Sequence, residues 1–215
     1  MQGWRKQRMQ SRIHVRMWVP ILCTAGVVLS GGSHSGTVLQ AGTSAVPAYG
    51  SVYRIAHAFG GITFADVLGD KDKRYNYGVG LQYFKPDPVF RFKRRRADLL
   101  QEIYVEQSSS VTNAGKGRNV FQAVGYLFGP RYNWHWGHAW GGYLDLGLGL
   151  QLNNRRTDDI PSRLNTTPFA GLGFWIPTHS MPLTVGLRFL HVSNAHQVGA
   201  NAGQNQFSLD VGVRF

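Results

Sequence analysis

From Tyr49 onward, the chain consists of segments of about ten residues in which apolar and polar side chains alternate. The last segment, residues 207–215, shows this most clearly. Its odd-numbered positions are all apolar, whereas its even-numbered positions are Ser208, Asp210, Gly212 and Arg214. Successive side chains of a β-strand point to opposite faces of the sheet, so the pattern predicts a strand with one apolar and one polar face.

Seven further segments repeat this pattern and are separated by Gly, Pro, Asn, Asp or basic residues. The alternation is clear in 75–83, 99–107, 140–150, 164–176 and 183–193, and less regular in 52–59 and 120–128. An even number of such segments is typical of a closed bacterial barrel. We therefore predict an all-β fold, an eight-stranded antiparallel transmembrane β-barrel over residues 46–215.

The first 45 residues predict a signal peptide and leader. A basic segment, Arg5 to Arg16, precedes an apolar run over 19–29, and small residues follow. A single N-terminal membrane anchor is less favoured, because a spanning helix needs about 20 apolar residues. Cleavage within 30–33 and cleavage as late as Ala45 both fit. The single cysteine, Cys23, lies in the leader, so we expect no disulfide in the mature chain.

A soluble β-sandwich could show the same alternation, with its apolar side in a packed core. Three features favour the membrane: the export signal, the final Phe215 in register with an apolar row, and aromatic residues at segment ends. These aromatic residues are Tyr75, Trp134, Trp136, Trp140 and Trp175. We therefore expect the outer membrane of a Gram-negative bacterium.

Charged residues within the segments lie on the polar side, which would face the lumen. They are Glu102, Glu106, Asp145, Arg188, Asp210 and Arg214. Both signs are present, so we expect a structural network of paired charges inside the barrel.

The formal charge of +12 raises nucleic acid as a partner, but five of the 23 basic residues precede the apolar run. Without them, 18 basic residues face 11 acidic ones, a charge of +7. The remaining basic residues cluster between segments, at 71–74, 91–96, 116–118 and 155–163. Two interpretations stay open for these clusters, solvated loops or contacts with anionic lipid headgroups. We expect no nucleic-acid partner, and we expect the 91–96 cluster to be periplasmic.

The apolar row of segment 183–193 ends on two reactive polar groups. Leu183, Val185, Leu187 and Phe189 are followed on the same parity by His191 and Ser193. On the last strand, the apolar row extends back to Asn205. An imidazole beside a hydroxyl, with a third polar group to orient the ring, is the arrangement of an activated serine. Taken alone, the three residues also fit an interfacial belt or a loop.

His135 and His138 have a spacing that could hold a metal, but no third ligand is near in the sequence. We interpret them as interfacial belt residues. We expect neither a metal nor another cofactor.

The stretch Phe189-Leu190-His191-Val192-Ser193-Asn194-Ala195, followed by Asn201-Ala202-Gly203-Gln204-Asn205, resembles PagL, the outer-membrane lipid A 3-O-deacylase family. Weaker similarity covers most of the mature chain. The resemblance implies an eight-stranded barrel whose outward-facing site hydrolyses the ester of the 3-linked acyl chain of lipid A.

The resemblance also implies roles for single residues. Ser193 would be the nucleophile and His191 the general base, while Asn194 and a backbone N–H near Ala195 or His196 would stabilise the oxyanion. The chain departs from the family pattern at Asn205, where well-known members have glutamate, and at His196, where they have glycine. An amide can orient an imidazole but cannot stabilise imidazolium by charge, so we expect slower chemistry or a different helper.

The expected partners are lipid A of lipopolysaccharide and the surrounding outer-membrane lipids, with the protein a monomer or homodimer. Two alternatives remain. One is a non-catalytic structural or adhesive barrel in which the motif is idle. The other is an acyltransferase with its acyl chain inside the barrel, which the outward parity of His191 and Ser193 disfavours.

Overall fold

The computed structural model describes residues 44–64, 72–92, 95–111, 120–137, 139–195 and 203–215. Residues 1–43 of the predicted leader, with Cys23, lie outside them. The strands are β1 (Tyr53–Thr63), β2 (Arg74–Phe92), β3 (Arg95–Ser110), β4 (Val120–Trp136), β5 (Trp140–Asn153), β6 (Leu164–Thr166), β7 (Phe169–Ile176), β8 (Leu183–Val192) and β9 (Gln204–Arg214). Within the described ranges, no helix has the length and apolar character needed to cross a bilayer.

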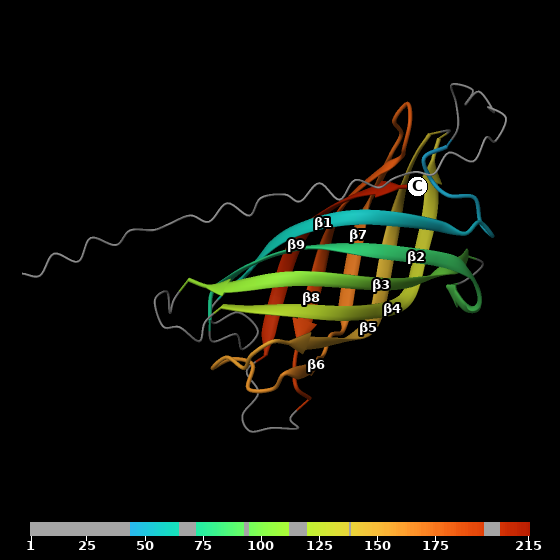
Figure 1. Ribbon diagram of the computed structural model, residues 1–215. Coiled ribbons are helices and arrows are strands. Elements are labelled where there is room, and N and C mark those ends of the chain that lie inside the picture. Colours follow the sequence, from blue (N-terminus) through green and yellow to red (C-terminus); the bar gives the residue numbers. More distant parts are fainter. Residues whose placement is uncertain (1–43, 65–71, 93–94, 112–119, 138, 196–202) are drawn as a thin grey trace, which may run out of the picture. The chain divides into compact units, whose positions relative to one another are not determined.

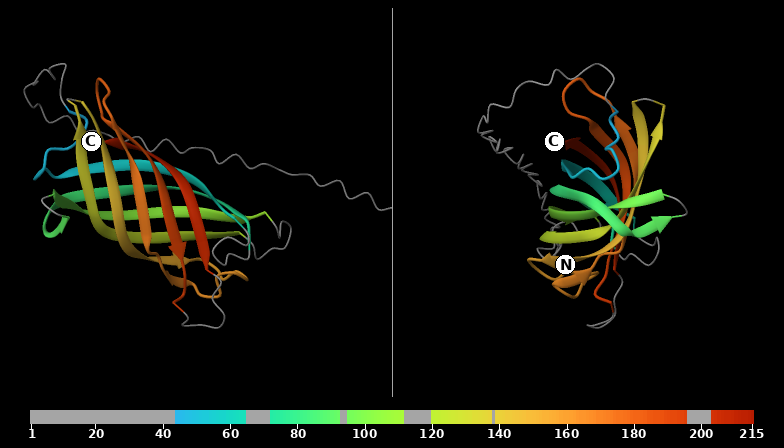
Figure 2. Two further views of the ribbon diagram at one scale, coloured as in Figure 1. Left: turned by 180° about the vertical axis from the view of Figure 1, so that it is seen from behind. Right: turned by 90° about the vertical axis from the view of Figure 1, so that its right-hand side faces the viewer.

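The strands form one closed antiparallel barrel (Figures 1 and 2). Strands that follow each other in the chain pair with each other, except β6 with β7, and β1 pairs with β9 to close the barrel. Strands β6 and β7 both pair with β5 and together occupy one position in the barrel. The predicted eight-stranded barrel is therefore confirmed.

The break between β6 and β7 is local. Thr166 and Phe169 keep the same register with β5 on either side of the break. Between them, Thr167 still donates its N–H to Gly149 O at 2.9 Å. Pro168 has no N–H to offer to a ladder, and this interrupts the regular strand. The stretch 164–176 thus behaves as the single strand that its alternation predicts.

An apolar band surrounds the outer surface of the barrel. Half-exposed apolar side chains occupy the predicted outward rows, among them Tyr77, Val79, Leu81, Ile103, Val105, Leu148, Leu150, Leu172, Leu187, Leu209 and Val211. Apolar side chains in such a band are stabilised by lipid rather than by water. The exposed Tyr75, Trp136 and Trp140 agree with the expected aromatic belt.

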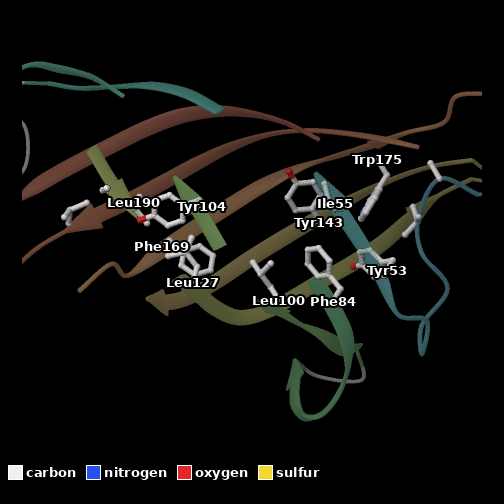
Figure 3. Packing of buried hydrophobic residues seen from close by; sticks show 14 of the residues in the cluster. Tyr53, Ile55, Phe84, Leu100, Tyr104, Leu127, Tyr143, Phe169, Trp175 and Leu190 are labelled. Atoms are coloured by element: carbon white, nitrogen blue, oxygen red, sulfur yellow. The ribbon is translucent and has the colours of Figure 1, made fainter. Parts of the chain in front are cut away.

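Trp175 is a correction to that belt. Its side chain is fully buried inside the barrel, where it packs edge-on against Tyr53 and Tyr143 (Figure 3). The reason is parity: Phe174 and Ile176 take the outward positions of β7, so Trp175 points inward with Gly173. An aromatic residue near a strand end is therefore not enough to indicate a membrane interface.

The lumen is filled by paired charges, as predicted. Glu102 accepts hydrogen bonds from Arg188 at 2.6 and 2.9 Å and from Gln82 at 2.8 Å. Asp210 lies 3.3 Å from Arg188 and 2.8 Å from the ring of His57. A second pair joins Arg131 to Asp145, in which Nε and Nη2 of the guanidinium each donate to one carboxylate oxygen.

Loop lengths distinguish the two ends of the barrel. At one end the connections 64–73, 111–119, 154–163 and 193–203 have nine to eleven residues, whereas at the other end 93–94, 137–139 and 177–182 have two to six. Outer-membrane barrels have short periplasmic turns and longer extracellular loops. The end that carries 193–203 is therefore the extracellular one.

The chain enters the barrel at the periplasmic end. Ala45 donates its N–H to Ala139 O at 3.0 Å, and Arg214 donates to Ala45 O at 2.9 Å. Ala45 and Val46 are buried there.

Candidate active site

The antiparallel pairing of β8 with β9 sets His191 directly opposite Asn205. His191 Nδ1 lies 2.8 Å from Asn205 Oδ1. The next pair along the same rows is Phe189 with Phe207, and then Leu187 with Leu209, both of which face outward. His191 and Asn205 therefore belong to the lipid-facing surface, at the extracellular end of their strands.

Ser193 is held just beyond the end of β8. Its backbone forms an antiparallel bridge with Thr166, with N–O distances of 2.7 and 3.0 Å. The Thr166 hydroxyl donates a further hydrogen bond to Ser193 O at 3.0 Å. Ser193 therefore continues the outward row of β8 from a fixed backbone, with its side chain largely buried against the neighbouring strand.

The chain turns sharply after Ser193. Ala195 has a left-handed backbone with a φ of 51°, which costs a residue with a Cβ roughly 1–2 kcal/mol. This turn brings the Ala195 N–H back to Ser193 Oγ, at 3.2 Å. Asn194 between them is buried. His196, the remaining predicted oxyanion residue, lies outside the described residues.

Gly203 allows β9 to approach the imidazole. Its φ is 72°, and a Cβ built there would lie 3.0 Å from His191 Cε1. A side chain at this position would press on the ring edge and on the backbone of Val192. Glycine at 203 therefore lets the imidazole lie close to the start of β9.

An apolar cavity of about 400 Å³ lies over β7, β8 and β9, next to the His191–Asn205 pair. Its lining consists mainly of apolar side chains on outward rows, with polar neighbours at its floor: Leu144, Ala170, Gly171, Leu172, Leu187, Arg188, Phe189, Phe207, Ser208 and Leu209. Phe189 and Phe207 pack against each other with ring centroids 5.0 Å apart at the end nearest His191. The cavity can accept a hydrocarbon chain from the membrane side.

A buried ion pair holds the 154–163 loop over the extracellular end. Asp159 accepts two hydrogen bonds of 2.8 Å from Arg74 and one of 2.8 Å from Gln204, the residue before Asn205. Burial raises the pKa of the Asp159 carboxyl, but hydrogen bonds from Arg74, Gln204 and Thr157 lower it more. The net pKa lies below the ordinary value of 3.8. The carboxylate form is thus the form that fixes the loop.

The sequence singled out His191, Ser193 and Asn205 but not Thr166, which pairs with Ser193, or Asp159, which binds the residue before Asn205. A signal for Thr166 was present, because it is a polar residue in the outward row between Leu164 and Ala170. Asp159 lies in a loop with no alternation, and its partner Arg74 is 85 residues away. No local pattern could have joined them.

Among the residues that the structure describes, no group of three or more His, Cys, Asp or Glu side chains could hold a metal ion. Of the two histidines with metal-like spacing, His135 is exposed near the periplasmic end of β4, and His138 lies outside the described residues. Their interpretation as belt residues stays a prediction.

Comparison with known proteins gives one family match and several similar structures. The family model described as lipid A 3-O-deacylase (PagL) matches residues 76–214. A crystal structure of the outer-membrane enzyme PagL is 18% identical, with a TM-score of 0.57, over 74% of this chain and 98% of that one. A crystal structure of Neisserial surface protein A is 15% identical, with a TM-score of 0.48, over 76% and 95%. No curated protein matches the chain.

Proposed function

Because the chain belongs to the lipid A 3-O-deacylase (PagL) family of outer-membrane barrels, we propose that it releases the 3-O-linked acyl chain of lipid A through Ser193 and His191 on its lipid-facing surface. The observation that carries the proposal is the 2.8 Å contact between His191 Nδ1 and Asn205 Oδ1, with Ser193 two residues along the same outward row. This is the order of groups that an activated serine requires.

The orientation of the imidazole determines what it can do. With the Asn205 carbonyl oxygen as acceptor, Nδ1 carries the ring proton, and Nε2 keeps its lone pair. Nε2 can then take the proton of Ser193 Oγ as that oxygen attacks the ester carbonyl. The resulting imidazolium returns the proton to the sugar 3-oxygen as the carbon–oxygen bond breaks.

The second half of the reaction uses the same groups. The acyl chain is now an ester of Ser193. His191 removes a proton from water, the hydroxide oxygen attacks the acyl carbon, and Ser193 Oγ leaves with the proton from the imidazolium. The products are a free fatty acid and lipid A with a free 3-hydroxyl, and the enzyme is regenerated.

Oxyanion stabilisation falls to the turn after Ser193. The Ala195 N–H already reaches Ser193 Oγ at 3.2 Å, so a small shift would direct it to an oxygen on the attacked carbon. The Asn194 side chain, and a backbone N–H near Ala195 or His196, complete the proposed set. The apolar cavity beside Phe189 and Phe207 would hold the acyl chain that is cut.

Removal of either reacting group tests the proposal. In the serine protease subtilisin, loss of nucleophile or base costs on the order of a million-fold, and the two losses are not additive. We expect Ser193→Ala and His191→Ala each to abolish release of fatty acid from lipid A in detergent micelles, and the double variant to be no worse. Ser109→Ala, an outward serine at the extracellular end of β3, is the matched control and should keep full activity.

The same assay tests the alternative of a non-catalytic barrel. The observation in favour of that alternative is Asn205, an amide that cannot stabilise a positively charged His191 as a carboxylate would. If the wild-type protein leaves lipid A unchanged in a mass spectrum, the alternative is supported. If Ser193→Ala releases fatty acid at the wild-type rate, the assignment of Ser193 is wrong even though the protein is an esterase.

A further inference from the structure

Exposed arginines lie at the extracellular rim of the barrel, in the loop beside the candidate site. Arg155 and Arg156 follow the end of β5, and Arg163 precedes β6. Directly next to them, Leu152 and Leu164 face each other across the β5–β6 ladder and are about half exposed. The arginines therefore begin where the lipid-facing apolar band ends, which is the level of lipid headgroups.

These arginines are also close to the reacting serine along the barrel wall. Thr166, which pairs with Ser193, is only three residues after Arg163. At a rise of about 3.3 Å per residue, this places Arg163 roughly 10 Å from the serine's strand partner. If the ester bond of the lipid lies at Ser193, the lipid's headgroup would extend to these arginines at the rim.

The loop that carries the arginines is held in place. Asp159 is clamped by Arg74, Ile160 is fully buried, and Thr157 donates its N–H to Ile160 O at 3.0 Å. On the β4 side, Asn154 donates its N–H to Gln122 O at 2.8 Å. The arginines thus start from a fixed backbone, which lowers the entropic cost of binding a ligand.

We propose that Arg155, Arg156 and Arg163 bind the phosphate groups of the substrate lipid's headgroup, an inference that rests on the proposed function and names how its substrate is held. A guanidinium has five N–H donors in a planar fork that suits phosphate. Arg163 uses its Nε to bond Asn153 O at 3.1 Å, and its terminal nitrogens provide the remaining donors. Among the described side chains of this loop two are acidic: Asp159 is buried and paired with Arg74, and Asp158 is exposed. Three arginines against these two carboxylates leave the loop with a net positive charge.

Binding can be measured without turnover in the Ser193→Ala protein, purified in a zwitterionic detergent. The probes are lipid A with its phosphates and the same lipid after their removal. Arg156→Gln with Arg163→Gln should weaken binding of the phosphorylated lipid by about five-fold for each cation removed, and should leave binding of the dephosphorylated lipid unchanged. Arg156→Lys with Arg163→Lys should recover most of the loss, because charge is retained.

The matched control removes the same charge at the opposite end of the barrel, through Arg54→Gln with Lys85→Gln, both of which are exposed there. An equal loss in this control, or an equal loss for both lipids, would overturn the proposal. Displacement of the lipid by inorganic phosphate alone at millimolar concentration would show that the rim binds free phosphate instead. Since no step depends on Ser193, failure here leaves the catalytic proposal standing, and failure of catalysis leaves this binding measurable.

Discussion

At the scale of single residues, the distinctive feature is an amide where a carboxylate would stabilise the charged imidazole. Asn205 is buried and its Oδ1 lies 2.8 Å from His191 Nδ1, so it can select the tautomer and hold the ring. In the proposed reaction it would contribute no negative charge when His191 becomes positive. Orientation and charge stabilisation, which a single carboxylate combines, are therefore separable in this protein.

Substitution of Asn205 measures the two contributions in turn. Asn205→Ala should lower the rate of deacylation about ten-fold, the value of one neutral hydrogen bond, because the ring loses its fixed orientation. Asn205→Glu should raise the rate above wild type by a similar factor, because hydrogen bonds to charged groups are stronger. Fatty-acid release from lipid A measures both, and heat-modifiable gel mobility reports that each variant is folded. Unchanged turnover in Asn205→Ala would mean that another group orients His191.

At the scale of strands and loops, the sequence predicted the elements well because the signal is local. Alternation within one strand states which side chains share a face, and this was sufficient for all eight strands and for the outward parity of His191. The interruption at Pro168 did not disturb it, since register is maintained on both sides.

The contacts that the sequence could not predict are those between distant segments. Closure of β1 on β9 and the bridge from Ser193 to Thr166 depend on how strands stagger around the whole barrel. The pair Arg74–Asp159 depends in addition on the path of a loop. Parity within a strand contains no information on either.

The Arg74–Asp159 pair leads to a pH prediction at this scale. Because the pKa of Asp159 is lowered in the folded protein, its stabilising contribution is present above the unfolded value and is lost as the pH falls through the folded value. The 154–163 loop should therefore stay ordered at neutral pH and loosen only below about pH 3.8. Asp159→Asn should loosen the loop at every pH.

A fluorophore on Asp158→Cys, an exposed position in the loop, would report this through its anisotropy between pH 7 and pH 3. The expected result is a fall at the acid end in the otherwise unchanged protein and low, flat values with Asp159→Asn. A transition near neutral pH would point to a different group, and high anisotropy in the Asp159→Asn protein would show that the ion pair does not hold the loop.

At the scale of the whole barrel, the inner and outer faces of the barrel wall carry different kinds of side chain. The inner face carries paired charges and aromatic rings, including Arg131 over the rings of Phe84 and Tyr143 at 4.3 and 4.0 Å. The outer face carries the lipid-facing rows, the apolar cavity and the proposed reacting groups. Alternation along each strand keeps these two sets of side chains on opposite sides of one backbone. Stability and activity should therefore respond to different substitutions.

Glu102→Gln tests this separation from the inside. Glu102 is fully buried, accepts hydrogen bonds from Arg188 and Gln82, and lies 3.3 Å from His57 Nε2. Glutamine preserves the volume but removes the charge, which leaves Arg188 with Asp210 alone at 3.3 Å. Breaking a buried pair at one partner costs about 3–5 kcal/mol. The free energy of unfolding by guanidinium in micelles should fall by that amount.

The rate of deacylation by folded Glu102→Gln protein should stay at the wild-type value. Ser193→Ala should show the opposite result, with unchanged stability and no deacylation. A large loss of activity in a folded Glu102→Gln barrel would contradict the separation, because it would mean that the lumen network reaches through the wall to position His191.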